Sequence, residues 1–117
     1  MAAGEQIRAE VGYRHIQMLD SVTSNISSAW FDVRSFNQSC IGVEGKNEID
    51  FNATVSVHTS ISKTKPLRSE SGIVRDSVTA AGEITYDVLP CWMKVAVTDY
   101  KSGIISVNII LRPMGVK

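Results

Sequence analysis

The sequence predicts an all-β protein, an antiparallel β-sandwich of about seven or eight strands with Greek-key or jelly-roll connections. Three observations lead to this fold class. Apolar and polar residues alternate over several segments, as expected for strands with one buried face. Turn-forming residues separate these segments at short intervals. The chain has 117 residues, a length that suits one domain around one core.

The beginning of the chain differs from the rest. We expect residues 1–20 to form an N-terminal arm that leads into a first strand near Arg14–Leu19, because Gly4 and Gly12 disfavour a long helix there. We expect the sandwich domain to occupy residues 21–117. We expect the arm to contact neighbouring subunits through Ile7, Val11 and Tyr13. The alternative is that the arm closes the sandwich of its own chain.

Alternation first appears in residues 29–36, where Trp30 and Phe36 would lie on the face opposite Phe31 and Val33. It is most regular in the stretch "IDFNATVSVHTSI". The intervening Gly45 and Asn47 tolerate the positive φ of a hairpin turn. We therefore expect Ser39–Glu44 and Glu48–Ile61 to pair as a hairpin. The polar face of the longer arm would meet water and its apolar face the core.

The second half of the chain continues the pattern. We expect a polar loop over "KTKPLRSESG", strands over "IVRDSVTA" and "EITYDVL", and a turn at "AAGE" between them. The segment "CWMKVAVTDY" places Met93, Val95 and Val97 on one face. A turn at "KSG" then leads into the last strand, "IISVNIILR".

The last strand is apolar on both sides. Its core face is formed by Ile105, Val107, Ile109 and Leu111, and Ile104 and Ile110 add apolar groups to the opposite face. Such a strand is covered on both faces, by a second layer of the protein or by another subunit. We therefore expect Ile104 and Ile110 to lie at a subunit interface.

Charge and cysteine content argue against several functions. Lys plus Arg and Asp plus Glu both total 12, so the chain lacks the basic excess of a typical nucleic-acid-binding protein. Lys63, Lys65 and Arg68 form a basic cluster that we interpret as a solvated loop. Cys40 and Cys91 form no CxxC pair, so we interpret them as free thiols, with a Cys40–Cys91 disulfide as the alternative.

The sequence offers little for catalysis. His15 and His58 are its only imidazoles, and His58 falls on the predicted polar face, where a solvated histidine needs no special role. The chain carries no nucleophile-elbow, zinc-protease or phosphate-loop motif. We therefore expect no enzymatic activity, no cofactor and no metal site. Turns explain the "DFN" and "TDYKSG" segments better than cation binding does.

The N-terminus has no apolar signal-peptide core, and no apolar run is long enough for a membrane-spanning helix. We therefore expect a protein made in a cytoplasm that binds no membrane. The large aromatic residues have two interpretations. Trp30, Trp92, Tyr86 and Tyr100 fill a core or a subunit contact, or they form an exposed platform that stacks on sugars.

Two segments carry a family resemblance. "SSAWFDVRSFNQSCIGVEGKNEIDFNATVSV" and "LPCWMKVAVTDYKSGIISVNIILRP" resemble small virion proteins of tailed bacteriophages, over roughly Ser28–Pro113. In such proteins a strand with an aromatic residue opens the domain, and a closing hairpin of this kind ends it. Several capsid decoration (cement) proteins and some tail or neck components share this pattern. The family has no catalytic motif, so the resemblance assigns no functional residue.

The resemblance implies a structural protein of the virion, made in the host cytoplasm. We expect a capsid decoration protein that stabilises the phage head by binding the major capsid protein or other virion proteins. A symmetric dimer and a symmetric trimer are equally compatible with this role. The alternative is a neck, tail-completion or tail-tube component. A third candidate, from a different class, is a carbohydrate-binding adhesin module, which would expose Trp30 and Trp92.

Overall fold

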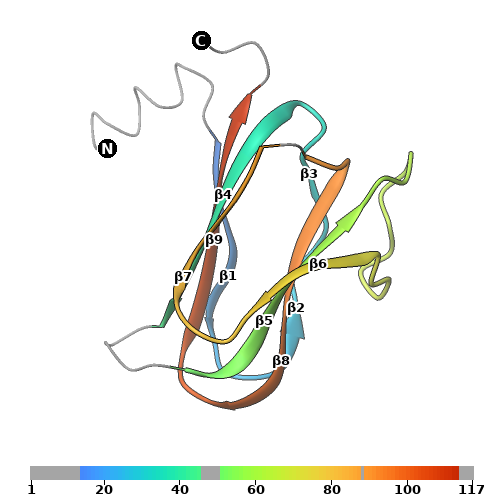
Figure 1. Cartoon of the computed structure of the whole chain (residues 1–117). Coiled ribbons are helices and arrows are strands. Elements are labelled where there is room, and N and C mark those ends of the chain that lie inside the picture. The colour runs from blue at the N-terminus through green and yellow to red at the C-terminus, as the bar shows by residue number, and fades with distance from the viewer. Residues whose placement is uncertain (1–13, 46–50, 88, 114–117) are drawn as a thin grey trace.

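In a computed structural model the chain is described over residues 14–45, 51–87 and 89–113. These ranges contain nine strands in two antiparallel sheets that pack face to face, which confirms the predicted β-sandwich (Figure 1). The predicted arm contacts Ile7, Val11 and Tyr13 lie outside the described residues.

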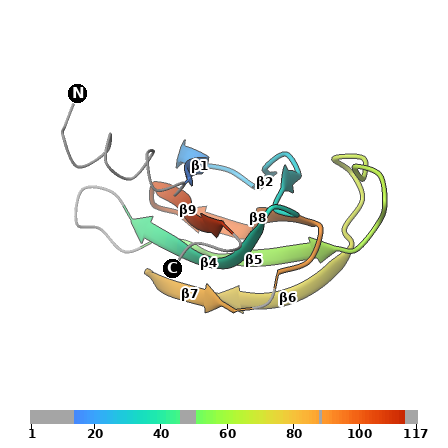
Figure 2. The same cartoon turned by 90° about the horizontal axis from the view of Figure 1, so that it is seen from above.

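We refer to the two layers as sheet A and sheet B. In sheet A the strand order is β1 (Arg14–Val22), β9 (Ile105–Pro113), β4 (Phe36–Gly45) and β7 (Gly82–Tyr86). In sheet B the order is β2 (Ile26–Ser27), β8 (Trp92–Ser102), β5 (Asn52–Ser60) and β6 (Ile73–Val78), and the short β3 (Phe31–Asp32) also pairs with β8. Figure 2 shows the sandwich from above, with β6 and β7 next to each other along one side.

The core lies between the sheets and is made of the side chains that the alternation predicted. The predicted inner faces of β8 and β9 are confirmed, since these seven residues are at most 1% exposed: Met93, Val95, Val97, Ile105, Val107, Ile109 and Leu111. Strands β4 and β5 complete the core with Ile41, Val43, Val55 and Val57. Burying such branched side chains provides most of the free energy that holds the sheets together.

The predicted hairpin is wrong. β4 pairs with β7 and β9 in sheet A, whereas β5 pairs with β6 and β8 in sheet B. The chain therefore crosses from one sheet to the other between these strands instead of turning within a sheet. Alternation predicts that each strand has one buried face, but two facing strands of a sandwich and two paired strands of a hairpin give the same pattern.

Two further local predictions are corrected. Residues 29–36 do not form one strand, because β3 covers only two residues and a turn precedes β4. The last strand begins at Ile105, so Ile104 lies in the connection before it and is half-buried. The predicted first strand is confirmed as β1, which forms an edge of sheet A and extends to Val22, past the predicted boundary at residue 20.

A polar contact joins the two sheets at the side where β6 and β7 run. The Tyr86 hydroxyl of β7 donates a hydrogen bond of 2.5 Å to the Asp76 carboxylate of β6. The Arg75 guanidinium lies 5.0 Å from the centre of the same phenol ring. Both strands lie at the edge of their sheets, so this contact links two edges that backbone hydrogen bonds do not connect.

We predict that Tyr86→Phe lowers the free energy of unfolding by about 1 kcal/mol near neutral pH, through loss of this hydrogen bond. Burial, helped by the Asp76 bond, raises the pKa of Tyr86 well above its ordinary value of 10.0. Above that pH the unfolded chain releases a phenol proton that the folded chain retains, so stability falls as the pH rises. Urea denaturation across this pH range should show a smaller fall for the variant; equal slopes would contradict the assignment.

Candidate interaction surfaces

Residues 61–72, which we call the β5–β6 loop, fold against the outer face of sheet B. In Figure 1 the loop lies on the far right, on the side of sheet B that faces away from sheet A. Its backbone carbonyls accept hydrogen bonds from side chains elsewhere in the sandwich. Trp92 donates to the carbonyl of Ser62, Trp30 to that of Leu67, Lys94 to those of Arg68 and Glu70, and His58 to that of Ser71.

Lys94 is the donor in this group that carries a formal charge, and it is almost fully buried. It lies on the outer face of β8 and is only 3% exposed. Its Nζ atom donates to the carbonyl oxygens of Arg68 at 2.8 Å and Glu70 at 2.6 Å, and lies 4.9 Å from the centre of the Trp30 ring. Burial lowers the pKa of Lys94, and the Arg68 charge adds to this effect. The two carbonyls and the ring face supply the partners that a buried ammonium needs.

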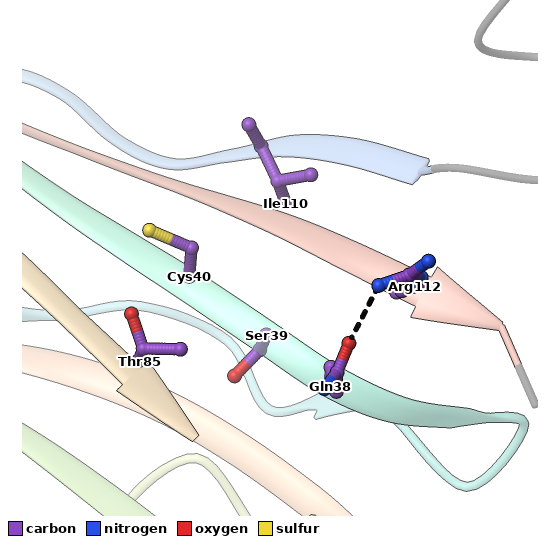
Figure 3. A pocket seen from close by; sticks show the side chains of 6 residues that line it. All are labelled: Gln38, Ser39, Cys40, Thr85, Ile110 and Arg112. Atoms are coloured by element: carbon purple, nitrogen blue, oxygen red, sulfur yellow. Dashed lines mark hydrogen bonds between the residues drawn. The ribbon is translucent and has the colours of Figure 1, made fainter. Parts of the chain in front are cut away.

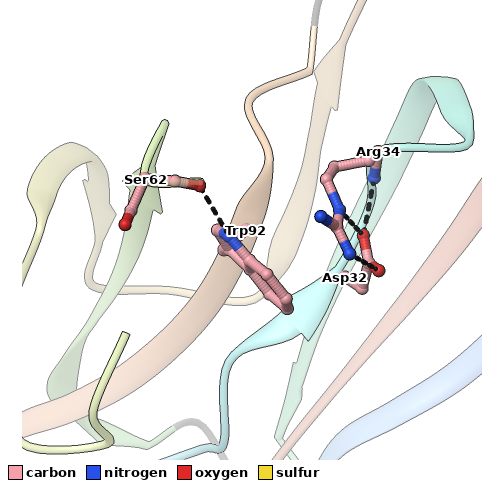
Figure 4. A network of polar contacts seen from close by, with 4 residues as sticks. All are labelled: Asp32, Arg34, Ser62 and Trp92. Atoms are coloured by element: carbon pink, nitrogen blue, oxygen red, sulfur yellow. Dashed lines mark hydrogen bonds and ion pairs between the residues drawn. The ribbon is translucent and has the colours of Figure 1, made fainter. Parts of the chain in front are cut away.

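Trp92 is fixed from two sides, as Figure 4 shows. Its Nε1 atom donates to the Ser62 carbonyl at 3.0 Å. The Arg34 guanidinium covers the ring at 4.8 Å from its centre and binds the Asp32 carboxylate at 2.7 Å. Hydrogen bonding to Arg34 lowers the pKa of Asp32 to about 2. Both charged side chains are about half exposed, so the pair orients Arg34 more than it stabilises the fold.

The outer face of β5 is therefore covered, contrary to the sequence prediction. Ser56 and His58 are 8% and 9% exposed, and His58 Nδ1 donates to the Ser71 carbonyl at 2.8 Å. The basic cluster is exposed as expected, at Lys63, Lys65 and Arg68. Arg68 also donates two hydrogen bonds to the Ser27 carbonyl. Most of the contacts that hold this polar loop to the sandwich are made by its backbone carbonyls.

The end of the loop depends on Gly72, whose φ is +55°. A Cβ atom at this position would lie 2.4 Å from the Thr59 carbonyl oxygen and 2.9 Å from the Trp30 ring. The position thus requires glycine for both its backbone conformation and its space.

The same region exposes most of the large apolar side chains on the described surface. Five such residues are exposed, and four of them fall within residues 61–74: Ile61 at 81%, Leu67 at 69%, Ile73 at 65% and Val74 at 53%. The fifth, Ile26, lies on β2. We call residues 61–74 the loop surface. Exposed apolar side chains on a fixed backbone are typical of a protein-binding site.

The outer face of sheet A is the second candidate surface. The strand register aligns side chains in rows across the four strands. The Ile110 row contains His15, Ile110, Cys40 and Thr85, and the neighbouring Gly42 row contains Gln17, Asn108, Gly42 and Glu83. Ile110 and Cys40 are half-buried at the centre of the face, where Figure 3 shows both projecting on the same side.

Two adjoining hollows mark this face. The first has a volume of about 210 Å³ and reaches from Cys40 and Ile110 to Thr85 and Arg112. The second, of about 200 Å³, shares Cys40 and Ile110 and extends over Gly42. Arg112 donates to Gln38 at 3.1 Å, which closes one end of the face. Of the predicted interface residues that the structure describes, Ile110 therefore lies at the centre of this surface and Ile104 does not line either hollow.

The remaining candidates are placed as follows. Both cysteines are free and half-buried. Trp30, Trp92 and Tyr86 are at most 7% exposed, so they present no flat platform for sugars. Within the described ranges, no three His, Cys, Asp or Glu side chains are grouped as a metal site would require. The described part of the chain also contains no helix long and apolar enough to span a membrane.

Comparisons with known proteins identify the fold alone. No protein-family model matches the sequence, and no curated protein matches it. The crystal structure of YomS, a protein derived from the SPBc2 prophage, superposes with a TM-score of 0.62 at 12% sequence identity. The match covers 85% of this chain and 91% of YomS, so it extends over most of both chains.

We predict that Gly72→Ala lowers the free energy of unfolding by about 2 kcal/mol or more, because the new methyl group meets the Thr59 carbonyl and strains the backbone. Gly82→Ala is the matched control, since a Cβ there meets nothing within 4 Å. It should leave stability unchanged or raise it slightly. Thermal and urea denaturation of the two variants would test this, and equal losses would show that Gly72 has no special role.

We predict that Lys94→Met releases the β5–β6 loop, because the Arg68 and Glu70 carbonyls lose their shared donor. Trypsin should then cleave after Lys63 and Arg68 at least about tenfold faster, as expected when about 1–2 kcal/mol of local stability is lost. Cleavage after the exposed Lys101, outside the loop, serves as the control. Uniform acceleration at all three sites would indicate global unfolding instead.

Proposed function

We propose that this chain is a structural, non-enzymatic protein of a phage particle, and specifically a decoration protein that binds the head shell. The observation that carries the proposal is the superposition on a prophage-derived protein over nearly the full length of both chains. It supports a phage role for a sandwich of this form. The sequence resemblance to small virion proteins agrees with it.

The loop surface supports a role in assembly. Binding partners lose affinity when a contact loop must first be ordered. Here the loop is already ordered by hydrogen bonds from Trp30, Trp92, Lys94 and His58. Its exposed apolar side chains can therefore be buried against a partner at little cost in conformational entropy. We propose that the loop surface contacts the major capsid protein.

Locating the chain on the particle tests the proposal. Particles of the phage whose genome carries this sequence would be purified, analysed by mass spectrometry and labelled with gold-conjugated antibody. Label over the head shell is the expected result. Label at the neck or along the tail would replace the decoration role with a neck, tail-completion or tail-tube role. Absence of the chain from purified particles would overturn a structural role in the virion.

We predict that the double variant Ile61→Asp, Leu67→Asp folds normally but is incorporated into particles at least about tenfold less, because two charges would have to be desolvated at the contact. Ile26→Asp places a charge on an exposed isoleucine outside the loop surface and is the matched control. Particle content would be measured by quantitative mass spectrometry. Equal incorporation of both variants would exclude the loop surface as the contact.

A further inference from the structure

We propose that the outer face of sheet A is the contact surface of a symmetric homodimer, in which the Ile110 row of each copy lies over the Gly42 row of the other. The occupant of this face is thus a second copy of the same chain. Such a dimer would form in the free protein, so it does not depend on the proposed function in the phage particle.

The two sheets differ in how their outer faces are covered. The outer face of sheet B is closed by the β5–β6 loop, and its Lys94 and His58 are at most 9% exposed. No described segment covers the centre of sheet A, where Ile110 and Cys40 remain half-buried beside two hollows. An apolar centre with a polar surround is the arrangement found in protein–protein interfaces.

The shape of this face complements itself. Ile110 is paired with Cys40, and two residues further along the same strands Asn108 is paired with Gly42. Gly42 lines the second hollow, and a Cβ atom there would meet nothing within 4 Å, so this position is a hole beside the ridge formed by the Ile110 row. The ridge and the hole are separated by about 7 Å, the length of two residues in a strand. A two-fold axis in the contact plane, perpendicular to the strands and midway between the rows, places the Ile110 row of each copy over the Gly42 row of the other. Cys40 of each copy then faces the other copy's Gly42, and Ile110 lies beside it over Asn108.

The charges select this axis over one parallel to the strands. Arg112 lies at one end of the face, in the row before Ile110, and Glu44 lies at the other end, in the row after Gly42. The perpendicular axis brings the Arg112 end of one copy over the Glu44 end of the other. An axis along the strands would place the two Arg112 ends together and the two Glu44 ends together, which like charges disfavour.

The size of the face predicts a dimer that dissociates on dilution. Four strands about 4.8 Å apart and about seven residues long give a footprint of roughly 450 Å² per copy. This is small compared with stable interfaces, so the affinity should fall in the range of weak, concentration-dependent dimers. Sedimentation velocity over a wide concentration range would measure it, and a protein that remains monomeric at the highest concentration would overturn the proposal.

Two substitutions test the face itself. Ile110→Asp puts a charge on the ridge, and Gly42→Leu fills the hole. Each should weaken dimerisation by at least about a hundredfold, because every substitution occurs twice in the dimer. Ile61→Asp, on the loop surface, should leave the dimer intact. A dimer that survives Gly42→Leu would be formed through another surface and would contradict the proposal.

Exchanging the charges of Arg112 and Glu44 distinguishes a loss of dimer contacts from misfolding of a variant. Arg112→Glu and Glu44→Arg should each weaken the dimer about tenfold, and the double variant should recover most of the loss. Circular dichroism and thermal melting would establish that all variants fold. Recovery requires that the two residues face each other across the interface, so losses that simply add would overturn the proposed axis.

Discussion

The outer half of sheet B depends on the burial of one charged group, the ammonium of Lys94. An ammonium at this depth is stable only if fixed oxygen atoms replace the water it loses. The Arg68 and Glu70 carbonyls are those atoms, and both belong to the β5–β6 loop. The loop and the sheet therefore stabilise each other. Without the loop, Lys94 would lose its two carbonyl partners. Without Lys94, the loop would keep its hydrogen bonds to Trp30, Trp92 and His58 but lose the two that it receives from the ammonium. Gly72 allows the chain to leave the loop and enter β6.

This dependence separates the two faces of the sandwich. Sheet B uses its outward side chains to hold a segment of its own chain, and that segment then exposes Ile61 and Leu67. Sheet A has no such covering within the described residues, and its outward side chains form a ridge at Ile110 and a hole at Gly42. The two candidate surfaces thus lie on opposite sides of the molecule (Figure 1). One is a loop held by hydrogen bonds from side chains. The other is a sheet face held by the backbone hydrogen bonds between its strands.

The sequence predicts the strands and their inner faces well, because period-2 alternation reports directly which side of a strand is buried. It does not report the pairing partner, so the same alternation predicts one hairpin for β4 and β5 although they lie in different sheets. It is also wrong at His58 and gives no indication that Lys94 is buried, because a polar segment covers both residues. The composition of that segment indicates solvent exposure, whereas the atoms that bind these residues are backbone carbonyls, which every sequence possesses. The sequence identifies Ile110, because an apolar residue on the face of the strand that points away from the core is unusual. It does not identify the hole at Gly42, because a glycine alone does not indicate what surrounds it.

The opposite placement of the two surfaces constrains any assembly that uses both. In a dimer through sheet A, four sheets stack about 10 Å apart, so the two outer sheets are separated by roughly 30 Å. Each outer sheet is a sheet B, and its loop surface faces away from the other copy. The dimer would therefore present its two loop surfaces in opposite directions. A flat lattice of capsid subunits could bind only one of the two loop surfaces, whereas two parts of a particle that face each other could bind both. The proposed binding to a head shell would thus favour either one engaged loop per dimer or dissociation of the dimer on the shell. The ratio of chains to capsid subunits would distinguish these two arrangements from one in which the dimer bridges two elements of the particle.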